Sequence, residues 1–244
     1  MTETRSVVRT EPGSKRIRAY LGGLLVADTT RPLLVWESSR YPTYYLPTDD
    51  IHAEFEATGE RERSPSRGTA DIYDVRAGDH VAAGAASVYT DPEIQALLGH
   101  VRIEWDAMDA WFEEDEEVFF HPRDPYTRLD ALRSTRHVVV ESGGKVLADS
   151  HAPVVVYETG HPPRFYLPAT DVRRELLVRS ERVTHCPYKG STTYFHVRLR
   201  EREERDLAWS YPAPFAESSS IAGMICFPAE RVDITIDGHR QGSS

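Results

Sequence analysis

The chain contains one sequence module written twice. Residues 18–51 recur 121 positions later as residues 139–172, without a gap in the register. The shared positions are Gly22-Gly23 and Gly143-Gly144, Asp28 and Asp149, Pro32 and Pro153, Glu37 and Glu158, Tyr45-Leu46-Pro47 and Tyr166-Leu167-Pro168, and Asp50 and Asp171. Each copy is longer than a solenoid repeat and long enough to close its own core, so the repeat predicts two tandem domains. Residues kept in both copies are explained by the fold, whereas residues found in one copy only are not required for folding.

Comparison of the two copies also predicts the domain boundaries. The register shifts to 122 where Gly68 matches Gly190, and to 123 where Leu98 matches Ile221, which are changes that surface loops tolerate. Two prolines within residues 121–125 interrupt regular structure between the copies. We therefore expect an N-terminal extension over 1–14, a first domain over 15–118, a joint over 119–135, a second domain over 136–238 and a C-terminal tail over 239–244.

The composition is that of an acidic globular protein. With 39 Asp and Glu against 29 Lys and Arg, the formal net charge is −10, and the basic residues form no stripe, so we expect no nucleic-acid partner. No apolar run approaches the roughly 20 residues that span a bilayer, and the N-terminus lacks the apolar core of a signal peptide, so we expect no membrane association. The two cysteines, Cys186 and Cys226, form no disulfide framework, and a cytoplasmic location is expected.

The residue pattern predicts many β-strands and little helix. In the second copy, hydrophobic and β-branched runs predict strands over 137–141, 145–148, 153–158, 192–199, 206–211, 221–227 and 232–236. The first copy follows the same order, with strands over 15–20, 24–27 and 32–37. Short helices are expected over 93–99 and over 171–178, the latter capped by Thr170 or Asp171. The fold class predicted is mainly β, built from antiparallel sheets.

A set of motifs runs through the second copy from residue 136 to residue 237. It comprises Gly143-Gly144, Ala148-Asp149, the valine-rich strand ending at Glu158, Phe165-Tyr166-Leu167-Pro168 with Asp171-Val172, Thr184-His185-Cys186-Pro187-Tyr188-Lys189-Gly190, Tyr194, Ala208-Trp209-Ser210-Tyr211 with Pro214, and Ile221-Ala222-Gly223 to Phe227. These motifs resemble those of a bacterial family known as domain of unknown function 427 (DUF427). The first copy departs from the pattern in its later half, with Arg67 in place of Lys189 and Ser87 in place of Trp209.

The resemblance to DUF427 proteins implies a β-tent (Mss4-like) fold, in which two antiparallel sheets are pinned at one edge and splayed around a pocket. That fold is similar to the folds of the cereblon ligand-binding domain and methionine sulfoxide reductase B. Many of these relatives hold zinc with two Cys-x-x-Cys pairs, but here the two cysteines are 40 residues apart and the ten histidines show no metal spacing along the chain. We therefore expect no metal site and no cofactor. The family carries no established activity.

The sharpest chemical cluster in the sequence surrounds Cys186. A thiolate flanked by His185 and Lys189 would be a good nucleophile or redox centre. The alternative is that Cys186 is a small buried hydrophobe at the start of a strand, because neighbours in sequence need not face one another. The first copy lacks this cysteine, so any thiol chemistry would belong to one domain only.

Paired charges and aromatic residues supply the remaining candidates. Lys189 and Arg67 occupy equivalent positions, before Gly190 and Gly68. Either cation can anchor an anionic group of a ligand, or it can form a salt bridge to Glu158 or Glu37. The aromatic residues can line a ligand cleft or pack in the core. We therefore expect a protein that binds an anionic or aromatic metabolite in the cleft between the sheets of the second domain, formed by Glu158, Tyr166, Cys186, Lys189, Trp209 and Tyr211. A degenerate first-domain site would be formed by Glu37, Tyr45, Arg67 and Tyr89.

Two alternatives to small-molecule binding remain open. One is an enzyme that uses Cys186 or the Glu158–Lys189 pair, and the other is a protein-interaction module without a ligand. The sequence also leaves homo-oligomerisation open.

Overall fold

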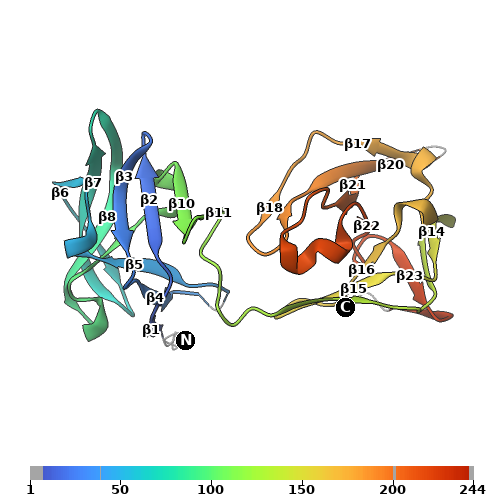
Figure 1. Ribbon diagram of the computed structural model, residues 1–244, viewed down its shortest axis with the longest axis horizontal. Helices are drawn as coiled ribbons and strands as arrows, with labels where there is room; N and C mark the ends of the chain where they lie inside the picture. Colours follow the sequence, from blue (N-terminus) through green and yellow to red (C-terminus); the bar gives the residue numbers. More distant parts are fainter. Residues whose placement is uncertain (1–7, 39, 200–201, 242–244) are drawn as a thin grey trace. The chain divides into compact units, whose positions relative to one another are not determined.

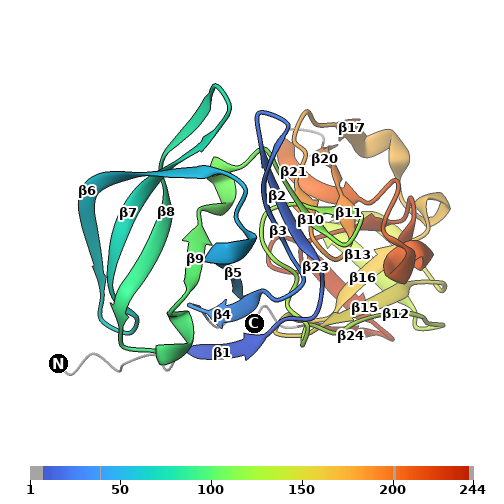
Figure 2. The ribbon, with the colours of Figure 1, turned by 60° about the vertical axis from the view of Figure 1, so that its left-hand side comes forward.

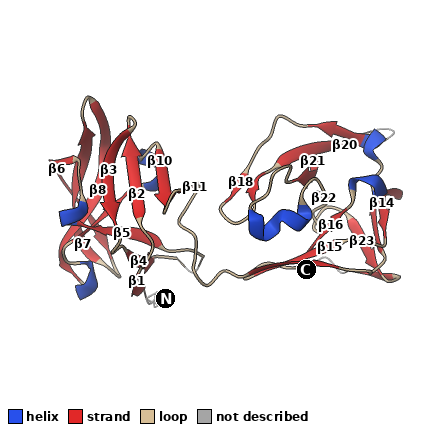
Figure 3. Ribbon diagram, viewed as in Figure 1, coloured by secondary structure: helices blue, strands red, loops and turns tan. Residues whose placement is uncertain are grey.

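The computed structural model describes residues 8–38, 40–199 and 202–241, and the chain divides into two compact units, residues 1–124 and 125–244 (Figure 1). Strands dominate both units, and the helices are short 3-10 turns (Figure 3). The predicted fold class, mainly β with two tandem domains of antiparallel sheets, is confirmed. Over the described ranges, no helix is long and apolar enough to cross a membrane.

In the described part of the first unit, a seven-stranded and a four-stranded antiparallel sheet form the fold (Figure 2). The larger sheet has the order β1 (Arg9–Pro12), β4 (Leu33–Trp36), β5 (Thr43–Pro47), β9 (His100–Ile103), β8 (His80–Pro92), β7 (Gly68–Ala77) and β6 (Glu54–Ser64). The smaller sheet has the order β11 (Glu116–Val118), β10 (Ala110–Glu113), β2 (Ile17–Leu21) and β3 (Leu24–Thr29). The 3-10 turns are η1 (Thr48–Asp50), η2 (Gln95–Leu97) and η3 (Trp105–Ala107).

The described part of the second unit repeats this plan. Its seven-stranded sheet has the order β12 (Leu129–Arg133), β15 (Val154–Glu158), β16 (Arg164–Leu167), β22 (Ile225–Cys226), β21 (Glu203–Ser210), β20 (Thr193–Arg198) and β17 (Leu177–Arg179). The smaller sheet has the order β14 (Lys145–Ser150), β13 (Val138–Ser142), β23 (Asp233–Ile236) and β24 (His239–Arg240), and β18 (His185–Cys186) pairs with β19 (Gly190–Ser191). The 3-10 turns are η4 (Ala169–Asp171), η5 (Arg174–Leu176) and η6 (Ala216–Ile221).

Three strands lie in segments that the sequence analysis placed outside the domains. β1 lies in the expected extension and pairs with β4, β12 lies in the expected joint and pairs with β15, and β24 begins the expected tail and pairs with β23. Residues 1–7 of that extension and residues 242–244 of that tail lie outside the described residues. Each unit thus includes strand partners beyond the range in which the two copies resemble each other.

The two predicted short helices are present only as 3-10 turns. Residues 93–99 contain only η2, and residues 171–178 contain the end of η4, all of η5 and the start of β17. The N-cap positions are Pro168 and Arg173 instead of Thr170 or Asp171, and no side chain caps either turn. The physical reason is that Leu177 already pairs with β20, which leaves too few residues for a regular helix. The predicted strand over 221–227 is also reduced to β22, because η6 extends to Ile221.

The repeated Gly-Gly pairs form the tight turns of two hairpins. Gly22 and Gly23 have φ angles of 60° and 74°, and Gly143 and Gly144 have φ angles of 57° and 72°. Two successive residues with positive φ are what a two-residue hairpin turn requires, and glycine adopts them without strain. The turns fix the registers of β2 with β3 and of β13 with β14.

The strands β15 and β16 of the larger sheet in the second unit carry buried side chains on both faces. Phe165 and Leu167 pack toward the smaller sheet, in a cluster that includes Val140. On the opposite face, Val156 and Tyr166 belong to a second cluster, which Ile221 of η6 also joins. A strand that is buried on both faces is expected to be a continuous hydrophobic run, which explains the consecutive valines of β15.

Candidate functional site

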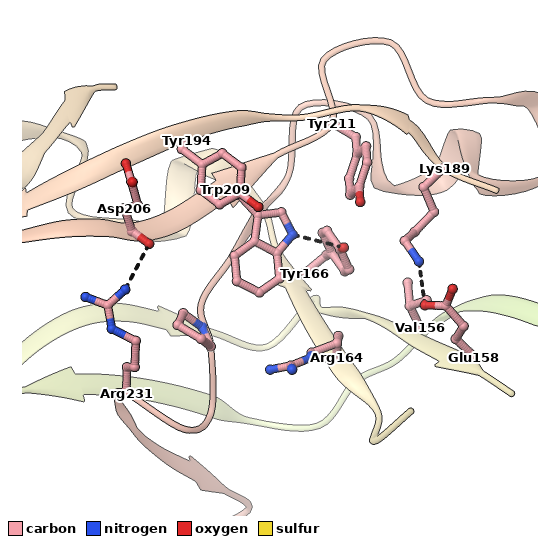
Figure 4. Close-up of a pocket in the computed structure, with 11 residues that line it drawn as sticks. Val156, Glu158, Arg164, Tyr166, Lys189, Tyr194, Asp206, Trp209, Tyr211 and Arg231 are labelled. Atoms are coloured by element: carbon pink, nitrogen blue, oxygen red, sulfur yellow. Dashed lines mark hydrogen bonds and ion pairs between the residues drawn. The ribbon is translucent and has the colours of Figure 1, made fainter. Parts of the chain in front are cut away.

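A cavity of about 320 Å³ opens on the second unit (Figure 4). It is lined by Val156, Glu158, Arg164, Tyr166, Lys189, Tyr194, Asp206, Trp209, Tyr211, Pro228 and Arg231. None of these residues belongs to the smaller sheet. Side chains on a strand alternate between its two faces, and the lining residues of the larger sheet lie on the face opposite to the one that packs on the smaller sheet. The cavity is therefore not between the two sheets, as the sequence analysis expected, but on the outer face of the larger sheet.

A salt bridge closes one end of the cavity. The Lys189 Nζ donates to Glu158 Oε2 at 2.5 Å, and these side chains are only 9% and 15% exposed. Glu158 ends β15, and Lys189 lies in the turn between β18 and β19. Each charge is thus neutralised by a partner held on a separate element, as partly buried charges require. The salt-bridge interpretation of the sequence holds for this pair.

Aromatic side chains form the middle of the cavity. The Trp209 indole N–H donates to the Tyr166 hydroxyl at 3.2 Å, and the Tyr166 and Tyr211 rings lie 6.3 Å apart. Burial raises the pKa of Tyr166 and of Tyr211 far above its usual range, so both hydroxyls are neutral at physiological pH. Tyr194 adds a further ring, 6.4 Å from Trp209. The wall is therefore apolar with neutral hydroxyl groups.

Two arginines border the aromatic wall. The Arg164 guanidinium lies over the Trp209 ring at 5.8 Å and forms a two-point contact with the Glu230 carboxylate at 2.7 and 3.0 Å. Arg231 donates to the backbone carbonyl oxygens of residues 205 and 206, at 2.9 and 3.3 Å, and its ion pair with Glu204 is longer, at 3.8 Å. Asp206 lies next to Arg231, and a hydrogen bond from Ser180 together with the nearby His196 and Arg182 lowers the pKa of its carboxyl group. Arg231 thus has the weaker carboxylate partner of the two arginines.

The structure places five of the six predicted second-domain residues around this cavity: Glu158, Tyr166, Lys189, Trp209 and Tyr211. Cys186 is not among the lining residues, but it packs against the hydrophobic cluster that includes the lining residues Tyr166 and Tyr211. Its sequence neighbour His185 is exposed and contacts Ser191 Oγ at 2.6 Å, since successive residues of a strand point to opposite faces. Cys226 is fully buried, and burial raises the pKa of its thiol.

Six further residues line the cavity and were not predicted as site residues: Val156, Arg164, Tyr194, Asp206, Pro228 and Arg231. A signal for Arg164 and Val156 was present, because they lie two residues from Tyr166 and Glu158 and therefore on the same strand face. Asp206 and Arg231 meet across the fold, with no corresponding signal in the spacing. Alternation along the strands thus identifies the lining residues of β15 and β16, but not Asp206 and Arg231.

The family model for a domain of unknown function, DUF427, matches residues 9–114 and matches again over residues 130–238. The chain belongs to the DUF427 family. The resemblance inferred from the motifs, including its tandem form, is thereby confirmed. No curated protein sequence matches the chain. The cavity described above lies within the second DUF427 domain.

The four residues predicted for the first DUF427 domain contact one another. Glu37 accepts a hydrogen bond from the Tyr45 hydroxyl at 2.8 Å and forms a salt bridge with Arg67. The Arg67 guanidinium also lies over the Tyr89 ring, at 5.9 Å from its centroid. A cavity of about 410 Å³ in this domain includes Glu37 but not the other three. The equivalent residues are thus retained as a packed group, of which only Glu37 lines this cavity.

Strand pairing reveals why the two domains differ at this place. In the first domain Tyr45 pairs with Arg102, which pairs with Ser87; in the second, Tyr166 pairs with Cys226, which pairs with Trp209. The large side chain thus belongs to β9 in the first domain (Arg102) and to β21 in the second (Trp209). In the first domain, Arg102 Nε donates to Glu37 at 3.1 Å. In the second domain, the small Cys226 takes the place of Arg102, and the larger side chain is that of Trp209 on the neighbouring strand.

Proposed function

We propose that the second DUF427 domain binds a small, planar aromatic molecule that carries an anionic group. The observation that supports this proposal is the open cavity of about 320 Å³ with its wall of Tyr166, Tyr194, Trp209 and Tyr211. Ligand sites are typically concave and rich in aromatic side chains, with a few polar groups that set the orientation. Trp209 has no counterpart in the first domain, so the fold itself does not require it.

The charges around the cavity support an anionic group on the ligand. Three lining residues are cations, Arg164, Lys189 and Arg231, against two carboxylates. Lys189 and Arg164 are engaged by carboxylates at hydrogen-bonding distance, whereas Arg231 contacts mainly backbone carbonyl oxygens. A guanidinium bound by neutral acceptors keeps its charge available, and its planar fork suits a carboxylate or a phosphate. Arg231 is therefore the residue we assign to anion recognition.

Thermal-shift measurements with aromatic carboxylates, aromatic phosphates and neutral aromatic compounds test this proposal. A ligand at 100 times its dissociation constant stabilises the folded state by about 2.7 kcal/mol. We expect stabilisation by anionic aromatic compounds, its loss in Trp209→Ser, which restores the first-domain residue, and its selective weakening for anionic compounds in Arg231→Gln. Tyr157→Ser is the matched control, because Tyr157 is exposed and lies outside the cavity in the same sheet.

Two results would contradict ligand binding at this site. One is the absence of stabilisation by any compound of the panel, which would favour the interaction-module alternative. The other is stabilisation that persists unchanged in Trp209→Ser, which would place the bound molecule elsewhere.

A further inference from the structure

A second cluster of reactive side chains lies on the smaller sheet of the second domain, and it shares no residue with the cavity. His137, Asp149 and His151 each offer one potential ligand atom, and these atoms all lie within 4.8 Å of one another. His137 Nε2 is 2.7 Å from Asp149 Oδ1, and the two imidazole rings stack with centroids 4.1 Å apart. His137 is half-buried and the other two are exposed, so the cluster is accessible from solvent.

The pairing of β13 with β14 brings the three side chains together. Val138 pairs with Ser150, so the preceding His137 lies opposite His151, and Asp149 lies two residues before His151 on the same face. Side chains that are opposite or diagonal across an antiparallel pair lie within reach of one another. His137 directly precedes β13 and His151 directly follows β14, so the cluster lies at the open end of the hairpin, where the pairing of Val138 with Ser150 holds the two strands together. Spacing along the chain does not reveal such a cross-strand cluster, and the sequence analysis therefore expected no metal site.

The first domain shows what the fold alone requires at this place. The equivalent residues, 121 positions earlier, are Arg16, Asp28 and Thr30. Arg16 forms a two-point salt bridge with Asp28, at 2.7 Å from Nε and 2.5 Å from the terminal nitrogen. A cation beside the shared aspartate is thus enough for the hairpin. The second copy keeps the aspartate and has two imidazoles around it, and the second of these, His151, has no counterpart in that salt bridge.

We propose that His137, Asp149 and His151 bind one divalent late transition-metal ion, of which Zn²⁺, Co²⁺ and Ni²⁺ are the appropriate class. Neutral imidazole nitrogens and a carboxylate oxygen are the ligands that these ions take in proteins. Three protein ligands leave at least one coordination position for water or another donor from solvent. On binding, the contact between His137 and Asp149 gives way to shared coordination of the ion.

Isothermal titration calorimetry of the full chain, freed of metal with a chelator and carrying no histidine tag, tests the site. Separate titrations with ZnCl₂, CoCl₂ and NiCl₂ should each show one equivalent bound. His137→Arg and His151→Thr restore the first-domain residues, so they should leave the melting temperature of the metal-free protein nearly unchanged. Each should weaken binding by at least about tenfold, the order seen even when supporting residues around a metal are removed. His161→Thr is a control, because His161 is an exposed histidine of the same domain outside the cluster.

The first domain offers the reciprocal experiment. Arg16→His combined with Thr30→His should create a second equivalent of bound metal, because the hairpin register is the same. Failure to gain this equivalent would contradict the claim that the hairpin register builds the site. Absence of saturable binding to the wild-type chain would overturn the proposal. Binding of one equivalent that survives both His137→Arg and His151→Thr would also overturn it, by placing the ion on other residues.

Discussion

The two copies use different cations, Lys189 and Arg67, to form the same salt bridge with a glutamate. Lys189 and Arg67 hold equivalent places, and each forms a salt bridge with the glutamate at the end of an equivalent strand, Glu158 after the valines of β15 and Glu37 after β4. Removal of one partner from a buried pair leaves a charge without compensation, which costs more than the pair itself contributes. The contribution of the salt bridge is therefore best tested at Lys189, by comparing a substitution that removes the charge with one that keeps it.

Lys189→Met should destabilise the protein by about 3 kcal/mol, the low end of the range for a buried pair, because Glu158 keeps some contact with water. Lys189→Arg introduces the first-domain residue and should cost less than about 1 kcal/mol. Urea denaturation followed by circular dichroism measures both values. If Lys189→Met were as stable as Lys189→Arg, the salt bridge would contribute nothing to the free energy of unfolding.

Among the secondary-structure elements, the two hairpins form as the sequence predicts, whereas the predicted short helices form only as 3-10 turns. Gly22-Gly23 and Gly143-Gly144 identify two-residue turns because glycine adopts two successive positive φ angles without strain. The segments around η2 and η5 carry helical signals, but strand pairing on their flanks leaves room only for 3-10 turns. Local propensity is a weak signal where tertiary pairing competes with it.

The candidate site was predictable to a similar extent. Motif positions and strand alternation give Glu158, Tyr166 and Trp209, which lie on one face of the sheet. The motifs and the alternation do not predict that Cys226 in the second domain corresponds to Arg102 in the first, because the sequence register between the two copies shifts before β22 and β9. The side of the sheet on which the cavity opens also depends on how the sheet curves, which residue patterns do not encode. For this reason the cleft was expected between the sheets.

The two Gly-Gly turns provide a matched test of turn geometry. Gly143→Ala should cost about 1 kcal/mol from the left-handed backbone alone, since the nearest obstacle to a new Cβ is the flexible Arg202 side chain at 3.2 Å. Gly22→Ala should cost more, because its Cβ would lie 2.0 Å from the His80 ring. Chemical denaturation of each variant measures the difference. The additional substitution His80→Ala should remove the extra loss of unfolding free energy that Gly22→Ala shows over Gly143→Ala. If the extra loss remained, its cause would be the backbone conformation and not the contact with His80.

At the scale of the whole molecule, each unit has its own hydrophobic cores. Over the described residues, the clusters of the first unit and those of the second share no member. The second unit begins before the range of internal resemblance, because β12 pairs with the whole length of β15 and places Leu129 and Ala131 against the hydrophobic cluster that includes Tyr166. A domain that starts at residue 136, the boundary expected from the repeat, would leave β15 as an exposed edge. Exposed hydrophobic edge strands destabilise a sheet and promote aggregation.

We therefore propose that residues 125–244 fold as an independent domain and that residues 136–244 do not do so equally well. The longer fragment should melt cooperatively in circular dichroism and keep the metal-binding hairpin and the cavity, because both are built within it. The shorter fragment should melt at least about 5 °C lower, since loss of β12 exposes the valines of β15, and a loss of 1 kcal/mol shifts the melting temperature of a domain of this size by several degrees. Equal melting temperatures would show that β12 is dispensable, and the domain would then begin where the repeat begins.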